Sequence, residues 1–307
     1  MPKSSSVSRN INLVAHRSRL NKLAVNGGTI AYLDEGPNDG VPIVLVHGMP
    51  TSSWLYRRIA DNLANQGFRV IAPDLLGFGA SDKPEGHDIY STRNQSMRII
   101  ELLDHLTISK AIFVGHDLGG PWVFEIADHE PQRISGMVIL NTSAYAELMR
   151  PPLQARMVGG PLGPMMMKMM GSKMGKIMIH KFFVDFTGTG KKLEKEVTYG
   201  HWLPLHEGGT RAFRAFAKDL KSAMGEFSRY AEALKRLHVP AMLIWGSEDP
   251  VLRQERMIPR FVEDLKIDPA EVHVLSGASH FLQEDRPYEI AEFIGSFIRS
   301  RRTDFPS

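Results

Sequence analysis

The sequence contains no cysteine among its 307 residues. Disulfide bonds, thiolate catalysis and cysteine-ligated metal sites are therefore excluded. Long apolar runs are also missing. No apolar stretch approaches the roughly 18 residues that a membrane-spanning helix needs. The Ser-rich residues 1–10 lack the apolar core of a secretory signal. We therefore expect a cytoplasmic protein.

A large excess of charge of one sign is missing as well. The 37 basic and 34 acidic residues leave a formal net charge of +3. No stripe of basic residues alternates with aromatic residues, so we expect no nucleic-acid partner. The composition, 43% hydrophobic and 23% charged, is ordinary for a globular protein. The length fits one large α/β domain with an inserted subdomain, present as a monomer or a homodimer.

Short apolar runs alternate with helical patterns along most of the chain. The runs predict strands at residues 41–46, 69–73, 111–115, 134–140, 241–245 and 271–275. Helical spacing is found at residues 51–66, 91–106, 121–129 and 288–301. Residues 22–35 alternate around Asn26-Gly27-Gly28, which is typical of a hairpin. This order predicts an α/β fold with a mostly parallel central sheet flanked by helices.

The alternation of strands and helices stops after Asn141. Residues 146–224 carry helical patterns and no strand signal, so we interpret them as a helical cap. The core then comprises residues 20–145 and 225–302. A cap in this position covers the carboxyl edge of the strands, where open α/β sheets bind ligands.

The cap contains one segment of biased composition. Seven methionines gather beside four lysines, namely Met165, Met166, Met167, Met169, Met170, Met174 and Met178 with Lys168, Lys173, Lys176 and Lys181. Three interpretations stay open: packing of the cap onto the core, an adaptable lining for a substrate tunnel, or a basic amphipathic face that touches a membrane.

The most informative segment is Gly115-His116-Asp117-Leu118-Gly119-Gly120, which follows a predicted strand and precedes a predicted helix. Glycines around a central residue allow a tight strand-to-helix turn that exposes the central side chain. In this position Asp117 is a candidate nucleophile. The alternative, an aspartate that only caps the helix, does not explain the two partners that follow.

Two further residues complete a triad. Asp249 follows the strand at residues 241–245, and His280 follows the strand at residues 271–275. In a fold with such an elbow the acid and then the base follow the nucleophile along the chain, as they do here. Since His201 and His206 are five residues apart, they do not share a helix face, and we expect no metal site.

These motifs resemble those of the α/β-hydrolase superfamily from about residue 20 to 302. The resemblance is to its epoxide hydrolase and haloalkane dehalogenase branch. The similar segments are His47-Gly48-Met49-Pro50 (H-G-x-P), residues 74–82 (D-x-x-G-x-G-x-S-D), residues 115–120 (G-H-D-W-G-G) and residues 279–285 around the base.

A carboxylate nucleophile indicates substitution at saturated carbon, because the ester that it forms is hydrolysable, whereas a serine would leave an ether. The resemblance implies that His280, oriented by Asp249, activates water. It implies that the N–H groups of Met49 and Leu118 hold the oxyanion. His47, Pro50, Trp202 and Phe281 are expected to bind a small apolar organic substrate. Only side chains and water are needed, so we expect no cofactor.

The leaving group distinguishes the two activities of this branch. Dehalogenases hold the halide with a Trp after the nucleophile and often an Asn within H-G-x-P, but this chain has Leu118 and Met49. Epoxide opening needs a Tyr or His donor, and Tyr199 is the first candidate, with His180, His201 and Tyr145 as others. The sequence therefore favours epoxide hydrolysis. Dehalogenation, another Asp-dependent hydrolysis and non-catalytic ligand binding remain as alternatives.

Overall fold

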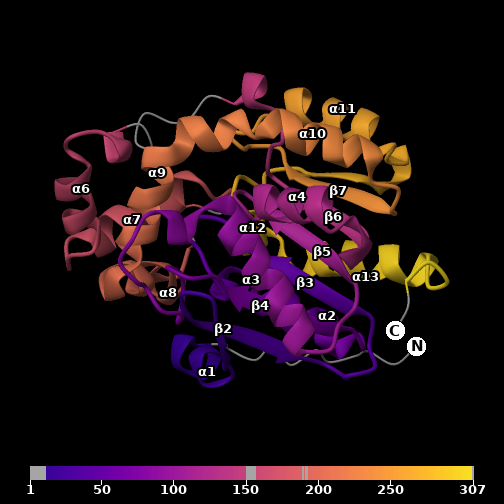
Figure 1. Ribbon diagram of the computed structural model, residues 1–307, viewed down its shortest axis with the longest axis horizontal. Coiled ribbons are helices and arrows are strands. Elements are labelled where there is room, and N and C mark those ends of the chain that lie inside the picture. Colours follow the sequence, from indigo (N-terminus) through magenta and orange to yellow (C-terminus); the bar gives the residue numbers. More distant parts are fainter. Residues whose placement is uncertain (1–11, 150–156, 189, 191–192, 306–307) are drawn as a thin grey trace.

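The computed structural model describes residues 12–149, 157–188, 190 and 193–305. Its centre is an eight-stranded sheet in the order β1-β2-β4-β3-β5-β6-β7-β8 (Figure 1). The strands are β1 (Asn21–Val25), β2 (Gly28–Glu35), β3 (Pro42–Val46), β4 (Arg69–Asp74), β5 (Ala111–His116), β6 (Ile134–Leu140), β7 (Ala241–Gly246) and β8 (Val272–Leu275). Strand β2 pairs antiparallel with β1 and β4, and the remaining pairs are parallel. The predicted hairpin and the mostly parallel sheet are confirmed.

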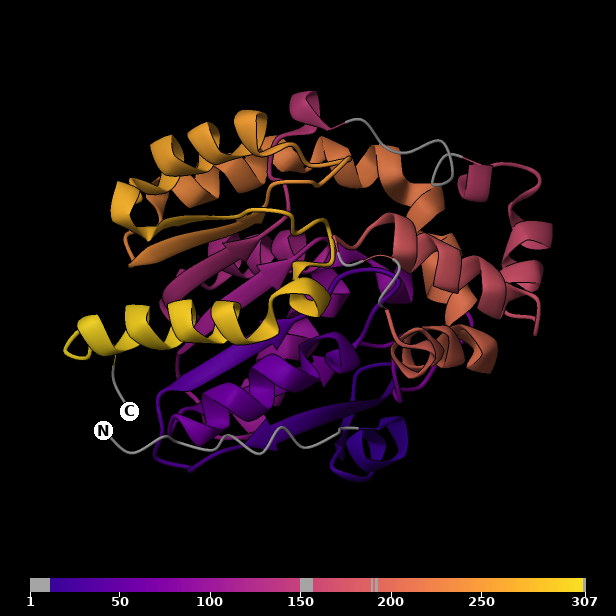
Figure 2. The same ribbon diagram turned by 180° about the vertical axis from the view of Figure 1, so that it is seen from behind.

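Helices cover both faces of the sheet (Figures 1 and 2). One face carries α2 (Ser53–Asn65) and α13 (Pro287–Ser300), and the other carries α3 (Thr92–His105), α4 (Gly119–His129), α10 (Phe227–Arg236) and α11 (Gln254–Leu265). Strand β3 shows why both faces are apolar. Ile43 and Leu45 join one buried cluster while Val44 and Val46 join the other, and all four are 0% exposed. The continuous apolar run is therefore a central strand that is buried on both faces.

Among the described residues between β6 and β7, all regular structure is helical. The helices are α6 (Gly163–Met170), α7 (Gly175–Asp185), α8 (Lys195–Pro204), which runs into a π-helical turn (Leu205–Gly209), and α9 (Thr210–Gly225), followed by α10. Figure 1 places α6, α7, α8 and α9 together to one side of the sheet. The boundaries 146 and 224 stay a prediction; α9 ends one residue beyond the second of them.

The methionine-rich segment is only partly packed. Met167 is buried at 4% exposure, and Met166 and Met170 pack partly against it. The other four, Met165, Met169, Met174 and Met178, are exposed. Core packing therefore explains one side of the segment and leaves the other side facing outward. Within the described ranges, no helix combines the length and apolar character needed to cross a bilayer.

Candidate active site

Asp117 occupies the turn between β5 and α4 with a φ of 50°. This left-handed conformation is uncommon for a residue with a side chain and is typical of a nucleophile elbow. Close packing explains the neighbouring glycines. A Cβ on Gly119 would lie 2.2 Å from the Val46 carbonyl oxygen, and one on Gly120 would lie 2.1 Å from Thr142 Oγ1. The turn is therefore tight enough to exclude larger residues while it projects Asp117.

The Asp117 carboxylate is held by backbone donors. Its Oδ2 accepts a hydrogen bond of 2.8 Å from the Met49 N–H, and the Leu118 N–H also donates to it. Gly48 permits this approach, since a Cβ there would lie 2.4 Å from the Cβ of Asp117. Burial raises the pKa of Asp117 despite the opposing effects of His280 and the two N–H groups. A less solvated, more basic carboxylate is a stronger nucleophile.

His280 lies between two carboxylates. Its Nδ1 is 2.8 Å from Asp249 Oδ2, and its Nε2 is 3.8 Å from Asp117 Oδ1. Burial lowers the pKa of His280, but the charges of Asp249 and Asp117 more than reverse this and leave it above its usual value. Asp249 Oδ1 accepts from the N–H groups of Val251 and Leu252. Burial raises the pKa of Asp249, but His280 and these donors lower it overall. Asp249 is therefore suited to stay ionised and to orient the base.

Asn141 is a site residue that the sequence analysis did not single out. It follows β6 with a φ of 29°, and its Nδ2 donates to Asp249 Oδ2 at 2.7 Å. Its Oδ1 accepts from the Gly246 N–H at 2.9 Å, which ties the end of β6 to the end of β7. The available signal was its position, a polar residue directly after an apolar strand at the carboxyl edge. Asn141 thereby fixes the carboxylate that orients His280.

A cavity of about 170 Å³ opens onto Asp117 and His280. Its other lining residues are Met49, Pro50, Thr92, Leu118, Pro121, Met149, Phe182, Phe186, Phe213, Phe216, Leu220, Ala223, Met224, Phe227, Val251 and Leu252. Of these, Thr92 alone carries a neutral hydroxyl. The phenylalanines come from α7 and the residue after it, from α9 and from the start of α10, so cap and core enclose the cavity together. Such a lining suits a small apolar molecule.

The predicted site residues divide into two groups. Met49, Pro50 and Leu118 line the cavity beside the triad. Tyr199 and Trp202 are not among its lining residues, although both were expected to meet the substrate. The Tyr199 ring lies beneath Lys176 Nζ at 4.6 Å, and Trp202 Nε1 donates to the Ser172 carbonyl oxygen. Both rings pack within the cap, so neither presents a donor to the cavity.

His47 and Phe281 lie behind the cavity rather than on its wall. His47 is fully buried, and its Nε2 accepts from the Leu75 N–H at 3.2 Å, which joins the H-G-x-P loop to the end of β4. Phe281 stacks on Phe183 with ring centroids 4.4 Å apart. Both residues therefore support the elements that carry the site.

The alternative donors are also engaged elsewhere. His180 pairs with Thr198, the Tyr145 hydroxyl donates to Asp264, and His201 contacts Glu284. None of these three side chains, nor any of the seven clustered methionines, is among the residues that line the cavity. In the described parts of the chain, no group of three or more His, Asp or Glu residues is arranged to hold a metal ion.

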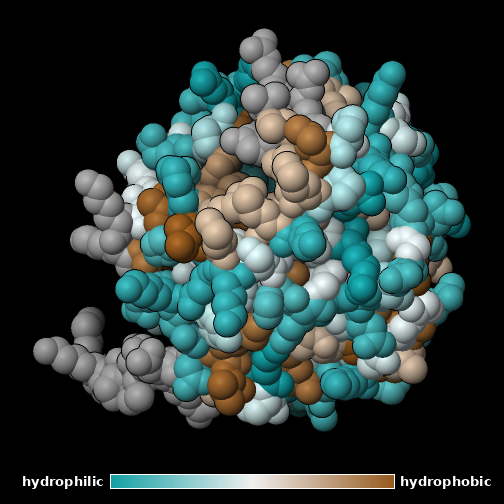
Figure 3. All heavy atoms as spheres, turned by 90° about the vertical axis from the view of Figure 1, so that its left-hand side faces the viewer, coloured by the Kyte–Doolittle hydropathy of each residue, from teal (hydrophilic) through white to brown (hydrophobic). Residues whose placement is uncertain are grey.

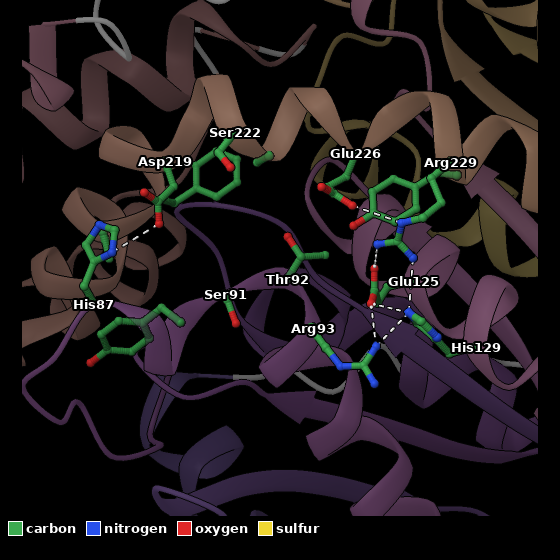
Figure 4. A pocket seen from close by; sticks show the side chains of 15 residues that line it. His87, Ser91, Thr92, Arg93, Glu125, His129, Asp219, Ser222, Glu226 and Arg229 are labelled. Carbon is green, nitrogen blue, oxygen red and sulfur yellow. Dashed lines mark hydrogen bonds and ion pairs between the residues drawn. The ribbon is translucent and has the colours of Figure 1, made fainter.

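A second pocket, of about 280 Å³, lies against the outer wall of this cavity (Figure 4). The two share Thr92, Phe216 and Ala223 as lining residues. Glu125 lies toward one end of it, beside Arg93 and His129, and forms an ion pair of 2.6 Å with Arg229, which comes from α10. Because Glu125 and Arg229 pair with one another, they connect α10 to α4. Their charges are therefore not free to bind a charged ligand.

The comparisons with known proteins agree with this geometry. A family model described as the alpha/beta hydrolase fold matches residues 41–161. A haloalkane dehalogenase of Mycolicibacterium paratuberculosis is 32% identical over 274 residues, which cover 87% of this chain and 86% of that protein.

Two solved structures show the same fold. The epoxide hydrolase CorEH has a TM-score of 0.76 at 22% identity and covers 92% of this chain and 98% of its own. The haloalkane dehalogenase DbeA from Bradyrhizobium elkani has a TM-score of 0.76 at 24% identity and covers 92% and 99%.

The chain is a member of the α/β-hydrolase family and is related to haloalkane dehalogenases. In this hydrolase a buried ion pair supports the helix that follows the base. Both Arg57 guanidinium N–H groups donate to the Glu284 carboxylate, at 2.6 and 2.7 Å. His201 Nε2 of the cap lies 3.1 Å from the same carboxylate. Burial raises the pKa of Glu284, but Arg57 and His201 lower it to about 2.

We expect Glu284→Gln to destabilise the hydrolase by about 3 kcal/mol or more, because it leaves the Arg57 charge buried without a counterion. Urea unfolding measures this free energy. Glu289→Gln is the matched control, since Glu289 is an exposed partner of Arg286 in the next helix. Its expected effect is within about 0.5 kcal/mol. Equal, small effects of both variants would contradict a structural role for the buried pair.

Proposed function

We propose that this hydrolase cleaves a bond between saturated carbon and a halogen in a small apolar substrate. The observation that carries the proposal is a carboxylate nucleophile beside a His–Asp pair in a phenylalanine-lined cavity. In the first step Asp117 attacks the carbon, the carbon–halogen bond breaks, and halide leaves with the bonding electron pair. The product is an alkyl ester on Asp117.

The second step restores the enzyme. His280 takes a proton from water, and the resulting hydroxide attacks the carboxyl carbon of the ester. The negative oxygen of the intermediate is held by the N–H groups of Met49 and Leu118, which already contact the carboxylate. The alkyl oxygen then leaves with the proton from His280 as the alcohol. Asp117 is left as a carboxylic acid, one of whose oxygens comes from water, and it loses its proton to solvent to regain the carboxylate.

The leaving group decides between the two activities of the branch. An alkoxide from an epoxide is a strong base that needs an acidic donor, whereas a halide is a weak base that can leave without a proton. The described residues that line the cavity include no Tyr, Trp, Arg or Lys. The positive edges of the phenylalanine rings offer a halide weak stabilisation. This favours halide release over epoxide opening.

Epoxide hydrolysis is the second candidate, because Thr92, which carries a hydroxyl, is among the residues that line the cavity. That hydroxyl can donate a hydrogen bond to an epoxide oxygen. It is a weaker acid than the phenol of a tyrosine, so we expect slower opening than a tyrosine donor would give. Thr92→Val removes the hydroxyl with little change of shape and therefore separates this role from packing.

The decisive experiment supplies short bromo- and chloroalkanes and simple epoxides in parallel, with halide and diol measured separately. We expect halide and alcohol in equal amounts, with little diol. Asp117→Asn is the control for background hydrolysis. Diol as the main product, lost in Thr92→Val, would replace the first candidate by the second. No product from either panel would overturn both.

The pH dependence follows from two raised pKa values. Asp117 must be ionised to attack and His280 must be neutral to accept a proton, so both steps slow as the pH falls. Asp249→Asn removes the carboxylate that raises the pKa of His280. We therefore expect the acid limb of ester hydrolysis to move to lower pH while its maximal rate drops. Rapid-quench measurement of the two steps checks this, and an unmoved limb would contradict it.

A further inference from the structure

The outer side of the cap carries an unusual concentration of exposed apolar side chains. Among the described residues, ten large hydrophobic side chains are exposed, and seven of them lie between residues 157 and 178. They are Met157, Leu162, Met165, Met169, Met174, Ile177 and Met178. We refer to these seven as the cap face. Met174 and Ile177 are 71% and 72% exposed, so they meet solvent almost fully.

Figure 3 shows one side of the molecule, the side on which α6 and α7 lie, with apolar side chains gathered around a hollow. Single exposed hydrophobic residues are normal on soluble proteins, but a contiguous group marks an interaction surface. The three remaining exposed residues, Val14, Val274 and Tyr288, belong to other elements. The cap face is therefore a local feature rather than a general property of the surface.

The charge of this segment has one sign. Residues 157–184 contain four lysines, all exposed, and no Asp or Glu. Lys181 pairs with Asp185 at the end of α7 and Lys176 lies over Tyr199, whereas Lys168 and Lys173 form no ion pair with any described residue. Exposed lysines interleaved with apolar side chains are the pattern of segments that lie on anionic membranes.

The same helices connect the cap face to the substrate cavity. Helix α7 exposes Ile177 and Met178, buries Ile179 and Phe183, and places Phe182 on the cavity wall. Helix α7 thus carries residues of both the outer apolar surface and the wall of the inner apolar cavity. A small apolar substrate concentrates in lipid, so a cap in contact with lipid would shorten its route to the cavity.

We propose that the cap face docks this protein on the surface of a bilayer that contains anionic lipids. The methionines and Ile177 enter the boundary between headgroups and acyl chains, and Lys168 and Lys173 contact the anionic headgroups. A second copy of the chain is a poorer occupant, because a symmetric contact would bring the lysines of both copies together. The attachment is peripheral and does not depend on which bond the enzyme cleaves.

Co-sedimentation of the full chain with vesicles tests the proposal. The probes are phosphatidylcholine vesicles with and without phosphatidylserine. We expect binding that increases strongly with phosphatidylserine and weakens with salt. The double variant Lys168→Glu/Lys173→Glu should bind the anionic vesicles about tenfold more weakly or worse. Met174→Gln/Ile177→Gln should also lower binding, since it removes exposed apolar area.

Val14→Gln/Val274→Gln is the matched control, because it removes two exposed apolar residues outside the cap face. It should bind vesicles as the unmodified chain does, and unchanged melting temperatures establish that every variant is folded. Absence of binding to both vesicle types, or equal binding of all variants, overturns the proposal. Concentration-dependent dimers that disappear in Met174→Gln/Ile177→Gln also overturn it, since they would assign the face to self-association.

Discussion

Asp117→Asn is expected to reduce turnover by about 10⁴-fold or more, because the amide cannot form the hydrolysable ester. The change preserves the shape of the side chain, and asparagine tolerates the positive φ of the turn. Its amide oxygen can still accept from the Met49 N–H. The loss of turnover would therefore result from the missing nucleophile and not from a change in the structure of the turn. Product formation under saturating substrate measures it, with thermal melting as the test of folding.

An amide at this position can hydrolyse back to the carboxylate when water is held nearby, and this would restore activity slowly. Asp117→Ala is therefore the second variant, since it has no group from which a carboxylate can form. Substantial turnover by both variants would show that the reaction uses another nucleophile. In that case the covalent mechanism would be wrong even if the substrate class were right.

The meeting of Asp117, Asp249 and His280 was predictable because each of them follows a strand of the same sheet. Strands that lie parallel in one sheet bring their carboxyl ends to one edge, so Asp117 after β5 and Asp249 after β7 meet there. His280, in the loop after β8, reaches the same edge. The glycines of the elbow added the local geometry. Apolar run length, strand order and turn chemistry therefore carried most of the information about the fold and the candidate catalytic centre.

The cap was less predictable, because helix propensity does not determine which side of a helix faces the core. Helix α8 packs Gly200 against Trp54, where a Cβ would lie 2.3 Å from the indole nitrogen. Trp54 in turn donates to the Val197 carbonyl oxygen. This close contact fixes the rotation of α8 and directs Tyr199 toward Lys176 rather than into the cavity. Only long-range packing contains that information.

Asn141 shows a second kind of site residue that a sequence pattern does not identify. A single asparagine after a strand has many possible roles, and its bond to Asp249 joins residues that are 108 positions apart. The chemistry of the site thus includes a support that no local pattern identifies. The prediction that Tyr199 donates to the leaving group met a similar difficulty. It depended on how the cap orients Tyr199, and Tyr199 is not among the residues that line the cavity.

His280→Gln is expected to separate the two chemical steps. Alkylation of Asp117 needs no proton transfer, so it should proceed, whereas hydrolysis needs the base and should stall by about 10³-fold or more. The ester then accumulates to about one alkyl group per chain. Mass spectrometry of the peptide that contains Asp117 should find the added alkyl mass. His273→Gln is the matched control, because His273 stacks on Phe293 away from the cavity.

Water labelled with oxygen-18 completes this test. Since hydroxide attacks the carboxyl carbon of the ester, the label should enter the Asp117 carboxylate of the unmodified enzyme during a single turnover and should be absent from the first alcohol released. Label in that alcohol instead would mean that water attacks the substrate carbon directly, with Asp117 as a general base. A trapped ester and a labelled carboxylate together require the covalent route, because direct attack produces neither.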